Sequence, residues 1–119
     1  MSDLNPLDKT TISPDVLVTI ARLSALSVPG VSRMANVTGG VNRFFKRGIH
    51  DGVRIEVEDN VVVANLYLVL KKDVNIREVS RNVQEQVARA LQDMVGMDIG
   101  SIEVHVENID YETGEARSE

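Results

Sequence analysis

The clearest pattern of apolar and polar positions lies mid-chain, where two strand-like segments flank a turn. In VRIEVE (53–58), apolar residues alternate with charged ones, as in a strand with one face in the core. Asp59 and Asn60 follow as a turn signal, so the next segment should fold back as an antiparallel hairpin. That segment, VVVANLYLVL (61–70), is apolar on both faces and predicts a central strand covered on both sides.

A helix is predicted ahead of this hairpin, beginning at Pro14. Ser13 is placed to cap the helix, and Pro14 suits the first helical position. Four apolar residues then recur at helical spacing, and Pro29-Gly30 ends the run. We therefore expect a buried stripe made of Val16, Leu17, Ile20 and Leu23.

A second, longer helix is predicted after the hairpin, over NIREVSRNVQEQVARALQDMVG (75–96). Asn75 and Glu78 have the spacing of a capping box, and Gly96 can end the helix. The predicted buried stripe consists of Ile76, Val79, Val83, Val87, Ala90 or Leu91, and Met94.

The remaining pattern completes an α+β fold. SIEVHVEN (101–108) alternates again, and Val31 to Met34 forms a short strand. A right-handed crossover through the second helix makes the last strand parallel to the long one. We expect one two-layer domain over 1–119, with a small mixed β-sheet, two helices packed on one face, an ordered core at about 10–110 and flexible ends.

Charge is distributed unevenly along the chain, whose formal net charge is -5. The segment 16–50 contains five cations and no acid. A basic segment in an acidic chain indicates a local binding surface for an acidic protein or an anionic membrane. A nucleic-acid-binding module that uses 16–50 is the alternative, and the net charge and the scarcity of aromatic residues disfavour it.

Composition also bears on the compartment. The chain has no Cys, no apolar stretch long enough to span a bilayer, and no apolar signal-peptide core near its first residue. These features predict a cytoplasmic protein without a transmembrane segment.

Catalytic chemistry finds little support in the sequence. There is no signature for a Ser nucleophile and no glycine pattern for a nucleotide. Glu103, His105 and Glu107 share one face of a predicted strand, and Glu56 and Glu58 belong to the same sheet. A divalent-cation or proton-transfer site is one interpretation, but a solvated outer face explains the alternation more simply. We therefore predict no enzyme, no cofactor and no metal site.

Three stretches in this order and spacing resemble the bacterial alkaline shock protein family: ISPDVLVTIARLSALSVPGVSRMA, GVRIEVEDNVVVANLYLVLKKDVNIREVSRNVQEQVARAL and MDIGSIEVHVENID. The resemblance runs from about Thr10 to Asp110. It implies a small non-enzymatic cytoplasmic α/β protein linked to envelope or alkaline stress. Some members of that family are linked to the control of fatty-acid synthesis at acetyl-CoA carboxylase, and some are attached to the membrane through a membrane-anchored protein partner. The resemblance makes both roles expectations for this chain. It carries over no catalytic residue.

Two features are candidates for partner binding. In the stretch 39–52, two aromatic residues and three cations form a predicted short amphipathic helix. Its aromatic pair either closes the edge of the core or forms an exposed docking element with the cations around it. The second apolar face of the long strand, which includes Tyr67, should be covered by another subunit in a weak homo-oligomer, by this stretch or by a partner. The candidate residues are Arg43, Phe44, Phe45, Lys46, Arg47 and Tyr67.

Overall fold

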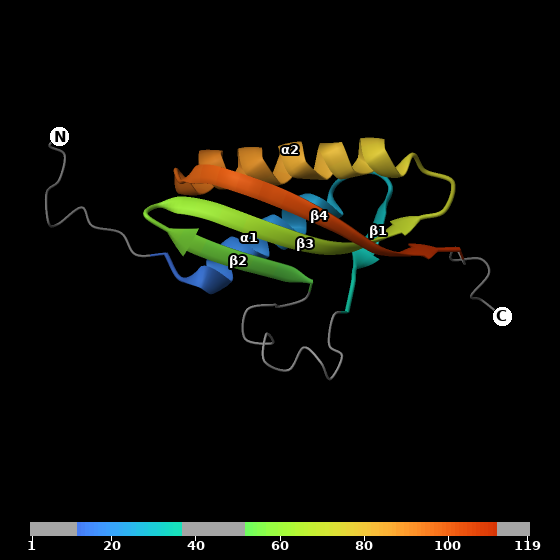
Figure 1. Cartoon of the computed structure of the whole chain (residues 1–119), viewed down its shortest axis with the longest axis horizontal. Coiled ribbons are helices and arrows are strands. Elements are labelled where there is room, and N and C mark those ends of the chain that lie inside the picture. Colours follow the sequence, from blue (N-terminus) through green and yellow to red (C-terminus); the bar gives the residue numbers. More distant parts are fainter. Residues whose placement is uncertain (1–11, 37–51, 112–119) are drawn as a thin grey trace, which may run out of the picture.

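The computed structural model describes residues 12–36 and 52–111 (Figure 1). Both predicted helices and all four predicted strands are present in the expected order. The elements are α1 (Pro14–Leu26), β1 (Val31–Met34), β2 (Val53–Glu58), β3 (Val61–Lys71), α2 (Ile76–Val95) and β4 (Asp98–Asp110).

The sheet is mixed and is organised around β3, as the sequence predicts. β4 runs parallel to β3 along its whole length on one edge, whereas β2 and β1 share the other edge as antiparallel partners. The change from β2 to β1 takes place at Tyr67. Its N–H donates to Gly52 O at 2.8 Å, and its carbonyl accepts from Ala35 N–H at 2.7 Å. The backbone of Tyr67 therefore joins three strands.

Both helices pack on one face of this sheet, which confirms the predicted two-layer α+β domain (Figure 1). The core lies between the layers. The inward residues of β3 are all fully buried, because the helices cover the centre of the sheet. They are Val62, Ala64, Leu66, Leu68 and Leu70.

The hairpin turn is the one that the sequence indicates. Asp59 and Asn60 have φ values of 55° and 65°, in the left-handed region that short polar side chains tolerate best after glycine. Two successive residues of this kind match the twist of the flanking strands, so β2 and β3 pair in register from Val53↔Leu66 to Glu58↔Val61.

The buried face of α1 differs from the prediction. Val16 and Leu23 are 46% and 56% exposed, and the buried residues are Leu17, Val18, Ala21 and Ala25. The expected stripe favoured the largest side chains. The helix instead turns its two alanines inward, where small side chains allow close packing of α1 against α2 and the sheet.

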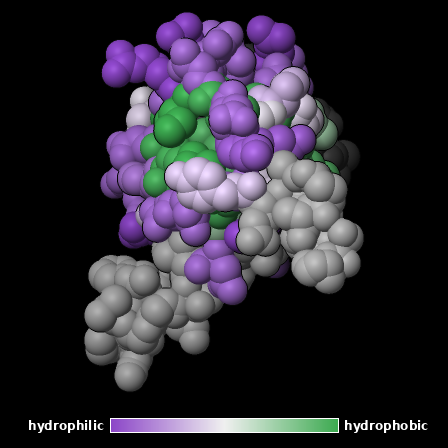
Figure 2. Space-filling model, turned by 90° about the vertical axis from the view of Figure 1, so that its right-hand side faces the viewer, coloured by the Kyte–Doolittle hydropathy of each residue, from purple (hydrophilic) through white to green (hydrophobic). Residues whose placement is uncertain are grey.

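The buried stripe of α2 is correct at its centre and wrong at its ends. Val79, Val83, Val87 and Leu91 are buried, but Ile76 and Met94 are 46% and 70% exposed. Ile76 is the first residue of the helix and Met94 the last but one, so the helix ends extend past the layer that they cover. Viewed from the end of the molecule where α2 begins, apolar side chains gather in a patch ringed by polar ones (Figure 2).

The helix caps also divide into one success and one failure. Asn75 Oδ1 accepts a hydrogen bond from Glu78 N–H at 3.0 Å, and Gly96 ends α2 in a left-handed conformation with φ 77°. Ser13 occupies the N-cap position of α1 but makes no side-chain cap bond. The sequence therefore predicts the N-cap residue of α1 correctly, but the expected hydrogen bond from the cap side chain is absent.

This difference supports a prediction on stability. Replacing Asn75 by Ala should lower the free energy of unfolding by about 1 kcal/mol, because the Glu78 N–H loses its acceptor. Replacing Ser13 by Ala should change it by less than about 0.5 kcal/mol, because no cap bond is lost. Urea unfolding of both variants measures the difference. Equal losses would show that the caps do not differ.

Candidate functional site

The face of the sheet turned away from both helices, here called the outer face, carries the candidate site. Paired residues on neighbouring strands point to the same side, so the register places the outward residues of β2, β3 and β4 together. No helix among the described residues covers this face. At its hairpin end and centre the outer face consists of Arg54, Glu56, Glu58, Val61, Val63, Asn65, Tyr67, Ser101, Glu103 and His105.

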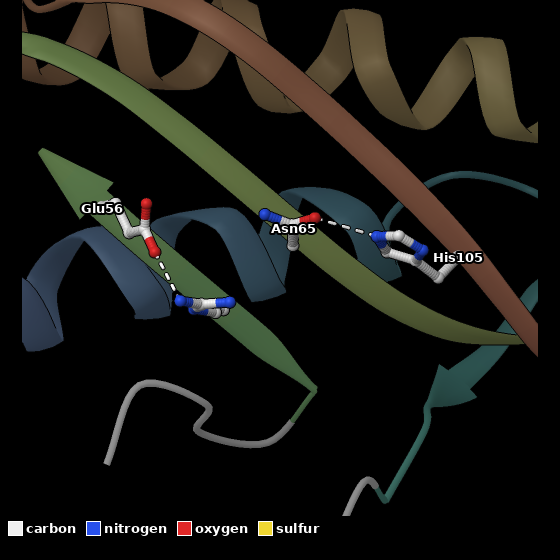
Figure 3. Close-up of polar contacts among 4 residues, drawn as sticks. Glu56, Asn65 and His105 are labelled. Carbon is white, nitrogen blue, oxygen red and sulfur yellow. Dashed lines mark hydrogen bonds and ion pairs between the residues drawn. The ribbon is translucent and has the colours of Figure 1, made fainter. Parts of the chain in front are cut away.

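The centre of the outer face is a cluster of three side chains. The rings of Tyr67 and His105, which are opposite each other on β3 and β4, are stacked with centroids 4.6 Å apart and an interplanar angle of 13°. His105 Nε2–H donates to Asn65 Oδ1 at 2.9 Å, and Figure 3 shows these two side chains reaching toward each other from neighbouring strands. The stack and the hydrogen bond hold both rings in a fixed orientation.

The hairpin end of the outer face is acidic. Glu56 forms an ion pair with Arg54 on the same strand, with 2.6 Å between Nη2 and Oε2 (Figure 3). Next to it lies a hollow of about 260 Å³, lined by Glu56, Glu58, Asp59, Val61 and Val63. Three carboxylates over an apolar floor favour a partner group that is cationic at its tip and apolar along its stem.

Comparison with known proteins places the chain in a family. Residues 3–111 match the family of alkaline shock protein 23, which has a cell envelope-related function. The chain belongs to this family. It is 33% identical over 109 residues to the uncharacterized protein YqhY of Bacillus subtilis, covering 90% of this chain and 81% of the relative. It is also 33% identical over 104 residues to a Streptococcus pyogenes protein, covering 87% and 80%. These matches confirm the resemblance seen in the sequence.

Solved structures support the fold alone. A copper form of the MamM CTD is similar to this alkaline shock protein family member with a TM-score of 0.53 and 14% identity, over 82% of this chain and all of that chain. A nickel form gives 0.51 and 14%, over 81% and 99%. At this identity the likeness shows a common arrangement of helices and strands and assigns no ligand.

The predicted partner-binding residues divide between described and undescribed parts of this family member. Tyr67 lies at the centre of the outer face, partly exposed, with Val61 and Val63 beside it on β3. Val69, further along the same face of β3, is buried. The other five candidates, Arg43, Phe44, Phe45, Lys46 and Arg47, fall outside the described residues, so both interpretations of the aromatic pair remain predictions.

The carboxylates around His105 do not gather into a metal site. The register of β4 skips Glu107, since Val106 pairs with Leu68 and Asn108 with Val69. Within residues 12–36 and 52–111, no three groups of His, Asp or Glu come close enough to hold a metal ion. The partner of His105 is the neutral amide of Asn65, so the geometry differs from a carboxylate-oriented catalytic base.

Asn65 is the residue that sequence reasoning missed. It stands out as the polar position in an otherwise apolar strand, and a buried-strand pattern interrupted in this way is a signal for a paired side chain. Its partner could not be named, because His105 is 40 residues away and the β3–β4 register is set by α2 and by a break at Gly100.

In the described part of the chain, no helix is long and apolar enough to cross a membrane.

Proposed function

We propose that this protein is a non-enzymatic adaptor of the cell envelope that binds a protein partner on the outer face of its sheet. The family supplies the connection to the envelope. The observation that carries the proposal is the Tyr67–His105 stack at the centre of a sheet face without a covering helix in the described structure. Tyrosine is enriched where protein interfaces concentrate their binding energy, because it offers a large apolar surface and a polar tip.

The charges of the outer face favour a protein partner with a basic contact surface. Glu56, Glu58 and Glu103 lie around the central cluster, and Arg54 beside them is already paired with Glu56. The other described cations of the outer face, Arg33 and Lys71, lie beside and beyond Val69, at the end away from the hairpin. Phosphate groups of a nucleic acid would meet repulsion here. A partner with Lys or Arg around an apolar centre would form complementary contacts and associate faster at low salt.

The finer points follow from the sequence and the family resemblance. The cationic stretch with Arg43, Phe44, Phe45, Lys46 and Arg47 joins β1 to β2 in the chain, and we propose it as a second contact element for an acidic part of the partner. A cytoplasmic location, attachment through a membrane-anchored protein and an action on acetyl-CoA carboxylase remain predictions.

A matched pair of tyrosine variants tests the proposal. Replacing Tyr67 by Ala should abolish capture of the partner from the native cell, because it removes the centre of the contact. Replacing Tyr111 by Ala should leave capture unchanged, since this side chain is exposed beyond the end of β4. The melting temperature of each variant shows whether the fold is retained.

Charge reversal at Glu56 and Glu58 gives a second test that does not disturb the core, because both residues are exposed. The double Lys variant should lose most partner capture and keep its stability.

Light scattering tests the alternative, in which a second copy of the chain and not a different protein binds the outer face. A mass that falls from dimer to monomer on Tyr67→Ala would contradict the adaptor proposal and favour the homo-oligomer.

A further inference from the structure

A second surface lies at the hairpin end of the molecule, on the other side of β2 from the outer face. The start of α1, the β2–β3 turn and the end of α2 meet there (Figure 1). They enclose a groove of about 560 Å³, here called the end groove. Its lining includes Ile12, Leu17, Val57, Asn60, Met94 and Met97. This volume is within the range of about 300–1,000 Å³ that is usual for ligand sites.

The groove exposes apolar side chains that the core does not use. Met94 and Val57 are 70% and 47% exposed, although both lie on faces that the pattern assigns to the interior. Methionine side chains are flexible and polarizable, and they are common where a surface must adapt to an apolar partner. The two lining methionines, Met94 and Met97, therefore suit the insertion of a bulky apolar group.

The charges around the groove are of one sign. Two lining residues adjoin an exposed acid that does not belong to the outer face: Pro14 is followed by Asp15, and Met94 is preceded by Asp93. No described Lys or Arg adjoins a lining residue. Arg54, three positions before Val57, points to the outer face and pairs with Glu56. The α2 C-terminus adds partial negative charge, and Asp15 counters the opposite charge at the start of α1.

From this combination we infer that the end groove binds a cationic amphipathic helix of a partner protein. Such a helix inserts apolar side chains at i, i+3 and i+4 into the groove, and its flanking Lys or Arg side chains meet Asp15, Asp93 and the negative end of α2. The same carboxylates repel a fatty-acid head group and an anionic bilayer. The end groove and the outer face lie on opposite sides of the hairpin, so the protein can hold two partners at once, and neither site depends on the other.

The test uses the full-length chain and a labelled helical peptide of about 15 residues, made of Leu and Lys with Leu at i, i+3, i+4 and i+7. Fluorescence anisotropy should show saturable binding that weakens as salt is added. The same peptide with Glu in place of Lys should bind at least about tenfold more weakly, because Asp15, Asp93 and the C-terminus of α2 repel it. Equal binding of the two peptides would overturn the inference.

Two matched Lys variants locate the contact. Met94→Lys should weaken peptide binding by about tenfold or more without lowering the melting temperature, because Met94 is largely exposed. Leu23→Lys adds the same charge at an exposed position of α1 outside the groove and should leave affinity within about twofold. Unchanged affinity in Met94→Lys would place the peptide elsewhere and contradict the inference.

The other occupants give distinct results. Binding to phosphatidylglycerol vesicles that Met94→Lys changes would identify a lipid surface, and a change in sedimentation mass would identify a second copy. Either result would overturn the inference. Tyr67→Ala should bind the Leu-Lys peptide like the unaltered protein, and Met94→Lys should still capture the partner of the outer face. Failure of this site is therefore distinguishable from failure of the proposed function.

Discussion

Replacing Leu66 by Ala is expected to lower the free energy of unfolding by about 2–5 kcal/mol. Leu66 lies on the inward face of β3, the central strand, and is fully buried. Removing most of its side chain takes away contacts with the core and leaves a cavity that strands fixed on both edges cannot close. A domain of this size has about 5–15 kcal/mol of stability, so the loss is a large fraction of the total.

The matched control is Leu23→Ala on α1. The chemical change is identical, but Leu23 is exposed to solvent, so the loss should be under about 1 kcal/mol. Denaturant unfolding of the two variants also tests the orientation of α1 directly. If Leu23→Ala cost as much as Leu66→Ala, the helix would bury the face that the sequence pattern first suggested.

The second large effect is expected at Gly52, which precedes β2 and accepts the hydrogen bond from Tyr67 N–H. Its φ is +81°, and a Cβ atom there would lie 2.8 Å from Ala35 O and 2.9 Å from Tyr67 O. Both neighbours are backbone atoms at the point where β2 and β1 share the edge of β3, so they cannot move without breaking the sheet. Gly52→Ala should cost on the order of 3 kcal/mol, from backbone strain and this overlap together.

Gly96 provides the control for the strain alone. Its φ is +77°, close to that of Gly52, but a Cβ atom would meet nothing within 4 Å. Gly96→Ala should therefore cost only about 1 kcal/mol. Thermal unfolding of the two variants measures the difference, and equal losses would show that the close approach at Gly52 adds nothing.

Local signals in the sequence account for most of the fold. The alternation in β2, the turn at Asp59 and Asn60, the two-sided apolarity of β3 and the cap at Asn75 each depend on a few adjacent residues. The mixed sheet then follows from the order of the elements and the hand of the crossover. Local propensity and global fold agree at these positions, as expected of a well-specified domain.

The features that the sequence did not predict depend on packing between distant segments. Ala21 and Ala25 orient α1, but alanine carries too little hydrophobic signal for a pattern to select it over Leu23. Met94 matches the period of a core residue, and only the length of the layer beneath α2 leaves it exposed. The Asn65–His105 bond requires the β3–β4 register, which is interrupted twice.

Site-specific photo-cross-linking in the native cell shows whether the outer face binds a partner protein through Tyr67. A photoreactive phenylalanine analogue replaces Tyr67 in one variant and Arg81, an exposed residue of α2 on the opposite layer, in the other. We expect one discrete adduct with a second protein from position 67 and none of that mass from position 81. No adduct at 67, the same adduct from both positions, or an adduct only with another copy of the chain would contradict partner binding through Tyr67.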